Sequence, residues 1–233
     1  MEDAQNPLAQ RLLPLARKPA GTLLIHEIYR SVQGESTFAG LPCVFVRLAV
    51  CDSRCSWCDT PHAFTQGRVS ALPGIIEKVL SYETPLVEIT GGEPLVQAEA
   101  IPLMSQLADQ ALTVLLETSG AHDIGPVDPR VHIIMDLKCP DSGEYARNRL
   151  ANLDILKASD QIKLVIASRD DFDWAVDTVR RHRLDQRFTV LVSPAFGLVT
   201  PLQLTDWLLQ SGLQVRMQIQ LHKIIWEPNA RGV

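Results

Sequence analysis

The sequence contains no long apolar run, and no stretch approaches the ~18 consecutive apolar residues of a transmembrane helix. It also contains no basic stripe, because acidic and basic residues are mixed along the chain and the net charge is −5. A nucleic-acid-binding surface is therefore not expected. Residues 1–22 begin acidic and lack the sustained apolar segment of a secretory signal. These absences predict a cytoplasmic protein with neither membrane nor nucleic-acid partners.

Linkers and repeats are missing as well. The 233 residues contain no Gly/Ser-rich linker and no internal repeat, which favours one domain of a size that can bury a proper core. We expect residues 1–22 to form a polar and mobile N-terminal extension, and residues 23–233 to form the single folded domain.

Short β-rich runs alternate with helical segments from Thr22 onward. Strands are expected over residues 22–29, 43–50, 85–90, 112–118, 131–138, 161–167, 188–193 and 214–222. Helices are expected near residues 71–81, 98–110, 147–158, 170–183 and 201–210. Alternation at this length predicts βαβ units around a parallel sheet, and therefore an α/β fold. In the last expected strand the polar residues at 214, 216, 218, 220 and 222 share one face, as in an edge strand wetted by solvent.

Cysteine is scarce, and three of the five cysteines fall within the segment CDSRCSWCDT, residues 51–60. They are Cys51, Cys55 and Cys58, with the spacing C-x3-C-x2-C. The other two, Cys43 and Cys139, lie at strand positions and are expected to be small buried apolar residues. In a reducing compartment, clustered cysteines indicate a metal site more often than disulfides. A zinc site would require a fourth ligand, for which His62 is close enough, whereas three thiolates alone suit a 4Fe–4S cluster with one open iron.

Polar or Gly-rich residues follow several of the expected strands. Gly91-Gly92-Glu93-Pro94 comes after the strand at 85–90, where two glycines would let the backbone approach a ligand and Glu93 could accept hydrogen bonds from an ammonium group. An ordinary turn is the alternative for this segment. Since ligands gather at the carboxyl ends of parallel strands, these loops and the cysteines are expected to form one active face.

Two strands carry polar side chains where apolar ones are expected. Arg47 lies in the apolar run 43–50 and requires an anionic partner, which is either an internal salt bridge or a ligand. In the strand at 85–90, Glu88 and Thr90 share a face, so two polar groups should point into a lumen.

The cysteine spacing, with Trp57 before the last cysteine and Gly91-Gly92-Glu93-Pro94 at the next strand end, resembles the radical S-adenosylmethionine superfamily. Further segments are similar to the 7-carboxy-7-deazaguanine synthase family. They are QGE with G-x-P after it, the strand that carries Arg47, CDT, ITGGEP, LETSG, MDLKCP and QLHK. The likeness covers residues from about 24 to 223.

This resemblance implies an incomplete TIM-like barrel of about six parallel strands, the radical S-adenosylmethionine core. It implies a 4Fe–4S cluster, S-adenosylmethionine and Mg2+ as cofactors, a reductant such as flavodoxin or ferredoxin, and a homodimer. The implied reaction, in queuosine biosynthesis, converts 6-carboxy-5,6,7,8-tetrahydropterin to 7-carboxy-7-deazaguanine with loss of ammonia. A radical from S-adenosylmethionine removes hydrogen from C6, so no protein side chain is expected to be catalytic.

The resemblance also assigns site residues. The cluster ligands would be Cys51, Cys55 and Cys58, and the Mg2+ ligand Thr60, a residue that otherwise reads as a helix cap. The S-adenosylmethionine contacts would be Trp57, Cys58, Asp59, Gly92, Glu93, Asp136, Lys138, Ser193, Pro194, Ala195 and Phe196. The substrate contacts would be Val32, Gln33, Gly34, Arg47, Thr90 and His222. For Asp136 and Lys138 a solvent-facing salt bridge is the ordinary alternative.

Three departures from the family pattern are visible. Gly34-Glu35-Ser36 replaces the common Gly-Glu-Gly, and Asp136-Leu137-Lys138 stands where many members have Ser-Pro-Lys. The sequence also runs through IIWEPNARGV past the short ending of some relatives, so a role for a terminal carboxylate is not carried over. Two other functions remain open from the sequence: a radical enzyme that activates a partner protein by forming a glycyl radical, and a non-catalytic zinc-binding interaction module.

Overall fold

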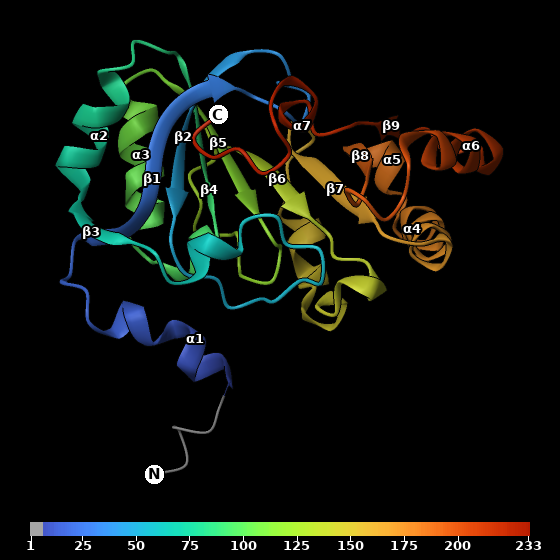
Figure 1. The fold of residues 1–233 in the computed structure, drawn as a ribbon, viewed down its shortest axis with the longest axis horizontal. Helices are drawn as coiled ribbons and strands as arrows, with labels where there is room; N and C mark the ends of the chain where they lie inside the picture. Colours follow the sequence, from blue (N-terminus) through green and yellow to red (C-terminus); the bar gives the residue numbers. More distant parts are fainter. Residues whose placement is uncertain (1–6) are drawn as a thin grey trace.

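The computed structural model describes residues 7–233, and the first six residues of the expected N-terminal extension lie outside the described part. Nine strands form one sheet in the order β3-β1-β2-β4-β5-β6-β7-β8-β9 (Figure 1). The strands are β1 Thr22–Val32, β2 Pro42–Leu48, β3 Arg68–Ala71, β4 Leu86–Gly91, β5 Thr113–Thr118, β6 His132–Asp136, β7 Gln161–Ile166, β8 Thr189–Pro194 and β9 Arg216–Met217. The α-helices are α1 Pro7–Ala16, α2 Leu72–Leu80, α3 Ala100–Asp109, α4 Arg169–His182, α5 Leu184–Arg187, α6 Pro201–Ser211 and α7 His222–Ile225.

Every neighbouring pair from β2 to β9 is parallel, whereas β1 pairs antiparallel with both β2 and β3. The predicted α/β class is therefore confirmed. Two of the longer helices begin at residues whose side chains cap the first turn. Ser168 caps α4 through a hydrogen bond from the Asp171 backbone, and Thr200 forms a reciprocal capping box with Gln203 at the start of α6.

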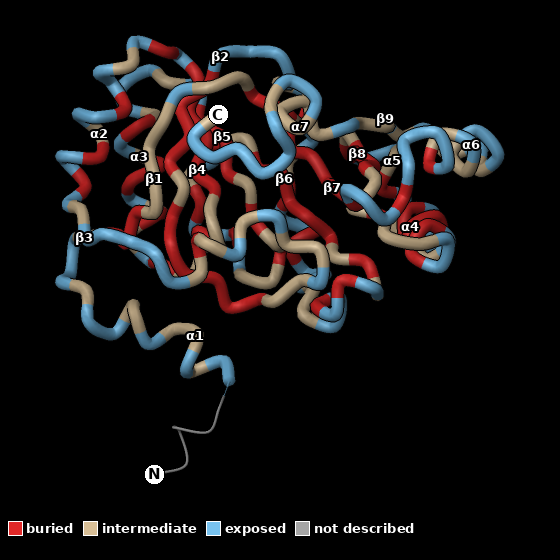
Figure 2. Tube along the Cα trace, in the orientation of Figure 1, coloured by how far each residue is buried: buried red, intermediate tan, exposed pale blue. Residues whose placement is uncertain are grey.

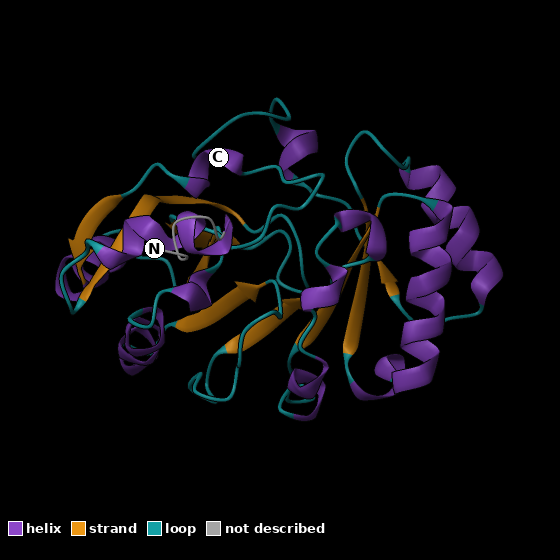
Figure 3. Cartoon of the chain, turned by 90° about the horizontal axis from the view of Figure 1, so that it is seen from below, coloured by secondary structure: helices purple, strands orange, loops and turns teal. Residues whose placement is uncertain are grey.

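The two faces of the sheet differ in what covers them. Helices α2, α3, α4 and α6 contribute buried residues to the large core on one face, and Figure 3 shows these helices against the outer side of a curved sheet. A smaller apolar cluster around Phe45, Leu115 and Ile134 lies on the other face. The central strands are buried along their length in Figure 2. The inner face is thus left for a site, with loops and the C-terminal segment across it.

The last expected strand is wrong over most of its length. In the sheet it consists of Arg216–Met217 alone, and α7 begins at His222. The side-chain oxygen of Gln218 instead accepts a hydrogen bond from the Ser36 backbone at 2.8 Å, and the Gln220 amide donates to Glu35. Gln218 and Gln220 of the expected polar face therefore contact the loop after β1, whereas Gln214 and Arg216 are exposed as expected. Alternation alone could not separate these two uses.

Three smaller differences concern local structure. Strand β3 and helix α1 were not expected, and the helix expected at 147–158 is a 3-10 helix over Leu150–Asp154. There the Asn152 amide donates to the carbonyls of Gly120 and His122, which ties this segment to the loop after β5.

Helix α1 packs against the sheet near the cysteine loop. Leu12 and Leu15 contact the buried cluster of Leu24, Ala49 and Val50. The Arg11 guanidinium donates to the Asp52 carbonyl at 2.6 Å. The division between an extension and a domain at residues 22 and 23 stays a prediction. Within residues 7–233, no helix combines the length and apolar character that crossing a membrane requires.

Candidate active site

A cavity of about 440 Å³ opens on the inner face of the sheet. Strands β1 to β8 each contribute lining residues except β3, and the segment 228–233 lines the cavity as well. Of the residues that the family resemblance assigns to the site, all but Glu93 line it. The strand ends after β2, β4 and β5 therefore meet on one face as expected, whereas Cys139 after β6 lies in the core instead. Which ligand each residue binds stays a prediction.

The three-cysteine loop runs from the end of β2 along the cavity wall. Cys51, Cys55 and Cys58 are free thiols, and all three line the cavity. A tetrahedral zinc site would hold its sulfurs ~3.8 Å apart, since Zn–S bonds are about 2.3 Å long. Among the described residues, however, these three sulfur atoms do not all lie within 4.8 Å of one another. Wider spacing fits a cluster whose thiolates bind separate irons, so the donors suit 4Fe–4S better than zinc.

Buried ionic contacts hold this loop from behind. The Asp52 carboxylate, 2% exposed, accepts hydrogen bonds from the His122 ring at 2.9 Å and from the Arg147 guanidinium. Burial raises the pKa of Asp52, but the hydrogen bonds from His122 and Arg147 outweigh it, so the pKa is lowered. Arg147 also donates to the Asp52 carbonyl at 2.9 Å. The loop is therefore anchored through both the backbone and the side chain of one residue.

The glycines after β4 lie against the start of the cysteine loop. The Gly92 backbone N–H donates to the Leu48 carbonyl at 3.0 Å, and that of Glu93 donates to the Val50 carbonyl at 3.0 Å. A Cβ atom at Gly92 would lie 2.2 Å from the Val50 oxygen, so a side chain has no room there. The two strand ends are thus in direct backbone contact, and glycine is required for that approach.

Glu93 lies behind the cavity wall and not in it. Its carboxylate accepts from the Thr118 hydroxyl at 2.8 Å, the Ser119 backbone at 2.7 Å and the Leu95 backbone at 3.0 Å. The side chain is fully buried. Glu93 therefore ties the end of β4 to the end of β5, and the expected direct contact with S-adenosylmethionine finds no support in the cavity lining.

Replacing Gly92 with alanine is expected to destabilise the protein. The added methyl group would force the backbone of β4 and the Val50 carbonyl apart, which typically costs about 1–3 kcal/mol and lowers the Tm by roughly 3–10 °C. Thermal unfolding of the purified variant measures this. Gly74→Ala is the matched control, because nothing lies within 4 Å of its Cβ position in α2, and it should leave the Tm unchanged or slightly raised. Equal Tm values for the two variants would contradict the close approach.

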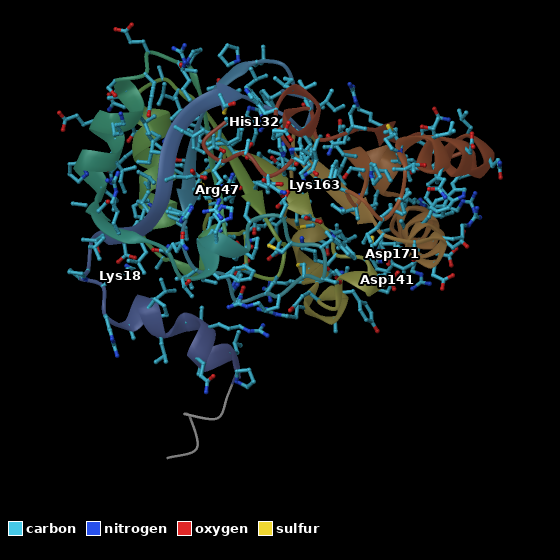
Figure 4. The ribbon with its side chains drawn as sticks, viewed as in Figure 1. Lys18, Arg47, His132, Asp141, Lys163 and Asp171 are labelled. Atoms are coloured by element: carbon cyan, nitrogen blue, oxygen red, sulfur yellow. The ribbon has the colours of Figure 1, made fainter. Side chains whose placement is uncertain are left out.

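Arg47 lies in the middle of the molecule, on β2 (Figure 4). Its guanidinium donates to Glu27 at 2.9 Å and to the Tyr29 hydroxyl at 3.1 Å, and it lines the cavity. The internal salt bridge that the sequence left open is therefore present. These contacts use the Nε and Nη2 donors on one edge of the guanidinium. Arg47 remains a cation at the cavity wall.

Lys163, on β7, forms the cationic centre of the cavity floor (Figure 4). Its ammonium contacts Glu117, and it lies 3.0 Å from Glu35. Burial lowers the pKa of Lys163, but the neighbouring carboxylates raise it more, so the ammonium stays charged. Glu117 also accepts from the Thr90 hydroxyl at 3.0 Å, and its pKa is lowered chiefly because Lys163 outweighs the effect of burial.

Glu88 is the buried acid of the lumen that the sequence predicted. Burial, followed by the nearby carboxylates of Glu117 and Glu35, raises its pKa well above the ordinary range. The Gln33 amide donates to it, and the Gln33 carbonyl oxygen accepts from the Glu35 backbone at 2.8 Å. The raised pKa favours the protonated carboxyl, which can donate as well as accept a hydrogen bond.

Thr60 precedes the 3-10 helix Pro61–Phe64 and occupies its cap position, but its hydroxyl makes no capping hydrogen bond. The Thr60 hydroxyl oxygen lies 3.9 Å from the Cys58 sulfur. Asp59 accepts from the Gln220 amide at 3.1 Å and lies 3.3 Å from the Lys223 ammonium. A hydroxyl facing the cavity without a capping role is available as an oxygen ligand.

The remaining predicted residues close the sides of the cavity. Asp136 and Lys138 form an ion pair at 2.6 Å, with side chains 10% and 15% exposed, so the solvent-facing alternative is wrong. His222, at the start of α7, lies close to Gly34, where a Cβ would be 2.7 Å from its ring nitrogen. Residues 193–196 lie at the end of β8.

No protein-family model matches the chain. A curated 7-carboxy-7-deazaguanine synthase from Chlorobaculum tepidum is 44% identical over 214 residues, which cover 91% of this chain and 97% of that protein. A second, from Koribacter versatilis, is 43% identical and covers 90% of this chain and 99% of that protein. The chain belongs to the 7-carboxy-7-deazaguanine synthase family. The crystal structure of QueE from Escherichia coli matches with a TM-score of 0.71 at 22% identity, over 89% of this chain and 98% of that chain, which shows a shared fold.

In this member of the 7-carboxy-7-deazaguanine synthase family, several cavity residues were missed by reasoning from sequence. They are Glu27, Tyr29, Glu35, Glu117, Lys163, Gln220 and the segment 228–233. Lys163 could have been found, because a lysine inside the apolar run QIKLVIA requires an anion as Arg47 does. No comparable signal marks the segment 228–233, whose place depends on the tertiary fold.

Proposed function

We propose that the chain is a radical S-adenosylmethionine lyase that converts 6-carboxy-5,6,7,8-tetrahydropterin to 7-carboxy-7-deazaguanine and ammonia. The observation that supports it most is the joining of two chemically distinct parts in one cavity. The first part is the three-thiol loop with the Gly-Gly strand end, and the second part is the set of buried cations and hydrogen-bonding acids; both parts line the cavity. An activase that forms a radical on a partner protein has no need of the second part.

The cofactors would be held by the first part. Cys51, Cys55 and Cys58 would bind the cluster, and Thr60 would bind Mg2+ through its uncapped hydroxyl. S-adenosylmethionine would contact Trp57, Cys58, Asp59, Gly92, Asp136, Lys138 and residues 193–196, all of which line the cavity. When bound, the cluster and S-adenosylmethionine together supply the radical that removes hydrogen from C6 of the substrate.

The second part would hold the substrate. Arg47 would bind the substrate carboxylate, since a guanidinium can donate two parallel hydrogen bonds to a carboxylate. Glu27 already orients the guanidinium by accepting a hydrogen bond from its Nε atom. Val32, Gln33, Gly34, Thr90 and His222 would contact the bicyclic ring. Glu88, which accepts a hydrogen bond from the Gln33 amide, would fix the orientation of that amide and hence which polar atom it offers to the ring.

Several wider features belong to the same proposal. The curved sheet would be an incomplete barrel of about six main parallel strands, in keeping with a chain too short for eight βα units. The protein would act in the cytoplasm, where its five free cysteines suit a reducing environment. A flavodoxin or ferredoxin would supply electrons, and two copies would form a homodimer; both are carried from the family resemblance.

The proposal is tested by incubating reduced, cluster-reconstituted protein with S-adenosylmethionine and the carboxypterin under anaerobic conditions. Deazaguanine product, identified by mass spectrometry, is the expected result. Deoxyadenosine without product would favour an activase. Protein that takes up one zinc per chain and forms no deoxyadenosine would favour the zinc module.

Thr60→Ala is expected to remove the stimulation of turnover by Mg2+. The variant lacks the oxygen ligand, so its rate should be the same with and without the ion, while the wild-type rate rises several-fold. Thr65→Ala, an exposed threonine just past the same 3-10 helix, is the matched control and should keep the response. An undiminished Mg2+ response in Thr60→Ala would remove Thr60 from the site.

A further inference from the structure

Three potential metal ligands converge beside the cavity, in a group that includes none of the cysteine sulfurs. His26, Glu27 and His62 each offer one ligand atom, and these atoms all lie within 4.8 Å of one another. Glu27 and His62 line the cavity, and the rings of His26 and His62 lie 4.9 Å apart. Two residues come from β1 and the third from the 3-10 helix after the cysteine loop.

A β-bulge brings His26 and Glu27 together. In a regular strand successive side chains point to opposite faces, so neighbours do not share a site. The pairing of β1 with β2 shifts between Ile25 and Glu27, because Ile25 pairs with Leu48 while Glu27 already pairs with Arg47. His26 is thus the extra residue, and such bulges re-aim side chains near functional sites.

Each imidazole is prepared for a metal in a different way. The Nδ1 atom of His26 lies 2.6 Å from the Gln66 carbonyl oxygen. That contact requires a proton on Nδ1 and leaves Nε2 with its lone pair, as metal-binding histidines are usually arranged. The Nε2 atom of His62 is buried and has no hydrogen-bond partner among the described residues. An orphaned buried nitrogen normally carries a free-energy cost, which a metal would remove.

The charged groups around these three residues allow a cation to bind, because Glu27 has a carboxylate oxygen that is free among the described residues and the repulsion from nearby cations is reduced. Glu27 gives one oxygen, Oε1, to Arg47, and its Oε2 atom has no recorded hydrogen bond within residues 7–233. The positive charge of Arg47 is partly offset by that ion pair. The other nearby cation, Arg231, is exposed, so its repulsion is screened by solvent.

We propose that His26, Glu27 and His62 form a binding site for a divalent transition metal of the zinc class, separate from the cysteine loop. Two imidazoles and a carboxylate suit Zn2+, Fe2+ or Co2+, whereas Mg2+ prefers oxygen donors alone. Three protein ligands leave a coordination position open, as in catalytic zinc sites. This site does not depend on the proposed reaction.

The test measures Zn2+ binding to cluster-reconstituted protein under anaerobic conditions, with iron and zinc both counted after gel filtration. One zinc per chain without loss of iron is the expected result. His26→Ala and His62→Ala should each raise the dissociation constant at least about tenfold. His182→Ala, a histidine at the end of α4, is the control and should bind like the wild type. If an alanine variant fails to fold, His62→Gln supplies the same comparison.

Co2+ provides a second readout. Its visible absorption should indicate nitrogen and oxygen ligands, with no sulfur-to-cobalt charge-transfer band, and the same spectrum should appear in Thr60→Ala. Three results would each overturn the site. The first is that the reconstituted protein binds no zinc, and the second is that both histidine variants bind zinc as tightly as the wild type. The third is that zinc uptake is matched by loss of iron and that the Co2+ spectrum shows thiolate ligands.

Discussion

Cys58→Ala should lose turnover by at least about 10³-fold, because the radical source requires the cluster and the cluster requires all three thiolates. Cys58 lines the cavity at the end of the loop, next to the Thr60 hydroxyl. With one of three ligands gone, no other described cysteine can take its place, since Cys43 and Cys139 are buried in separate apolar surroundings. Iron content and product formation after anaerobic reconstitution measure the loss.

Cys139→Ala is the matched control. It removes a fully buried sulfur from the main core and should cost about 1–2 kcal/mol of stability, yet keep the iron and the activity. If Cys139→Ala lost the cluster as completely as Cys58→Ala, or if Cys58→Ala kept it, the assignment of the ligands would be wrong.

Lys163→Met should lower the Tm by roughly 10 °C. The lysine side chain is 7% exposed, and its removal leaves Glu117 and Glu35 beside Glu88 without their cation. Breaking a buried ion pair on one side costs about 3–5 kcal/mol. In the variant the pKa of Glu117 rises above its unfolded value, so the folded state binds more protons than the unfolded state. Stability should therefore fall as pH rises, and the Tm deficit should be larger at pH 8 than at pH 5.5.

Two further variants make this interpretation specific. Lys163→Met combined with Glu117→Gln should recover part of the lost Tm, because one of the unpaired charges is gone. Lys78→Met replaces an exposed lysine on α2 and should change the Tm little. The Tm deficit of Lys163→Met could instead stay the same when Glu117→Gln is added and when the pH changes. That result would mean that Lys163 stabilises the protein through packing alone.

The central part of the fold was readable from sequence because its strands are buried on both faces. The runs at 85–90, 112–118 and 161–167 match β4, β5 and β7 within a residue or two, as expected for continuous apolar segments between turn signals. The cysteine spacing and the Gly-Gly strand end located the first part of the site. These signals are local, so a sequence displays them directly.

The features that the sequence did not predict depend on contacts between segments that are distant along the chain. Gln218 and Gln220 follow a strand pattern, but their partners lie in the loop after β1, more than 180 residues away. The bulge at His26 changes the side-chain alternation of β1 without any change in residue type that marks it. Glu93 reads as a ligand contact, and only its three hydrogen bonds reveal a structural link between strand ends.

The order of elements along the chain also bears on how the cavity comes into being. Its wall takes residues from Glu27 through to Val233, so β1 and α7, which lie far apart in the sequence, both border it. Parallel strands joined by crossovers make non-local contacts, which form slowly. A nascent chain that still lacks α7 therefore cannot present the complete cavity, because His222 and the segment 228–233 form part of its wall.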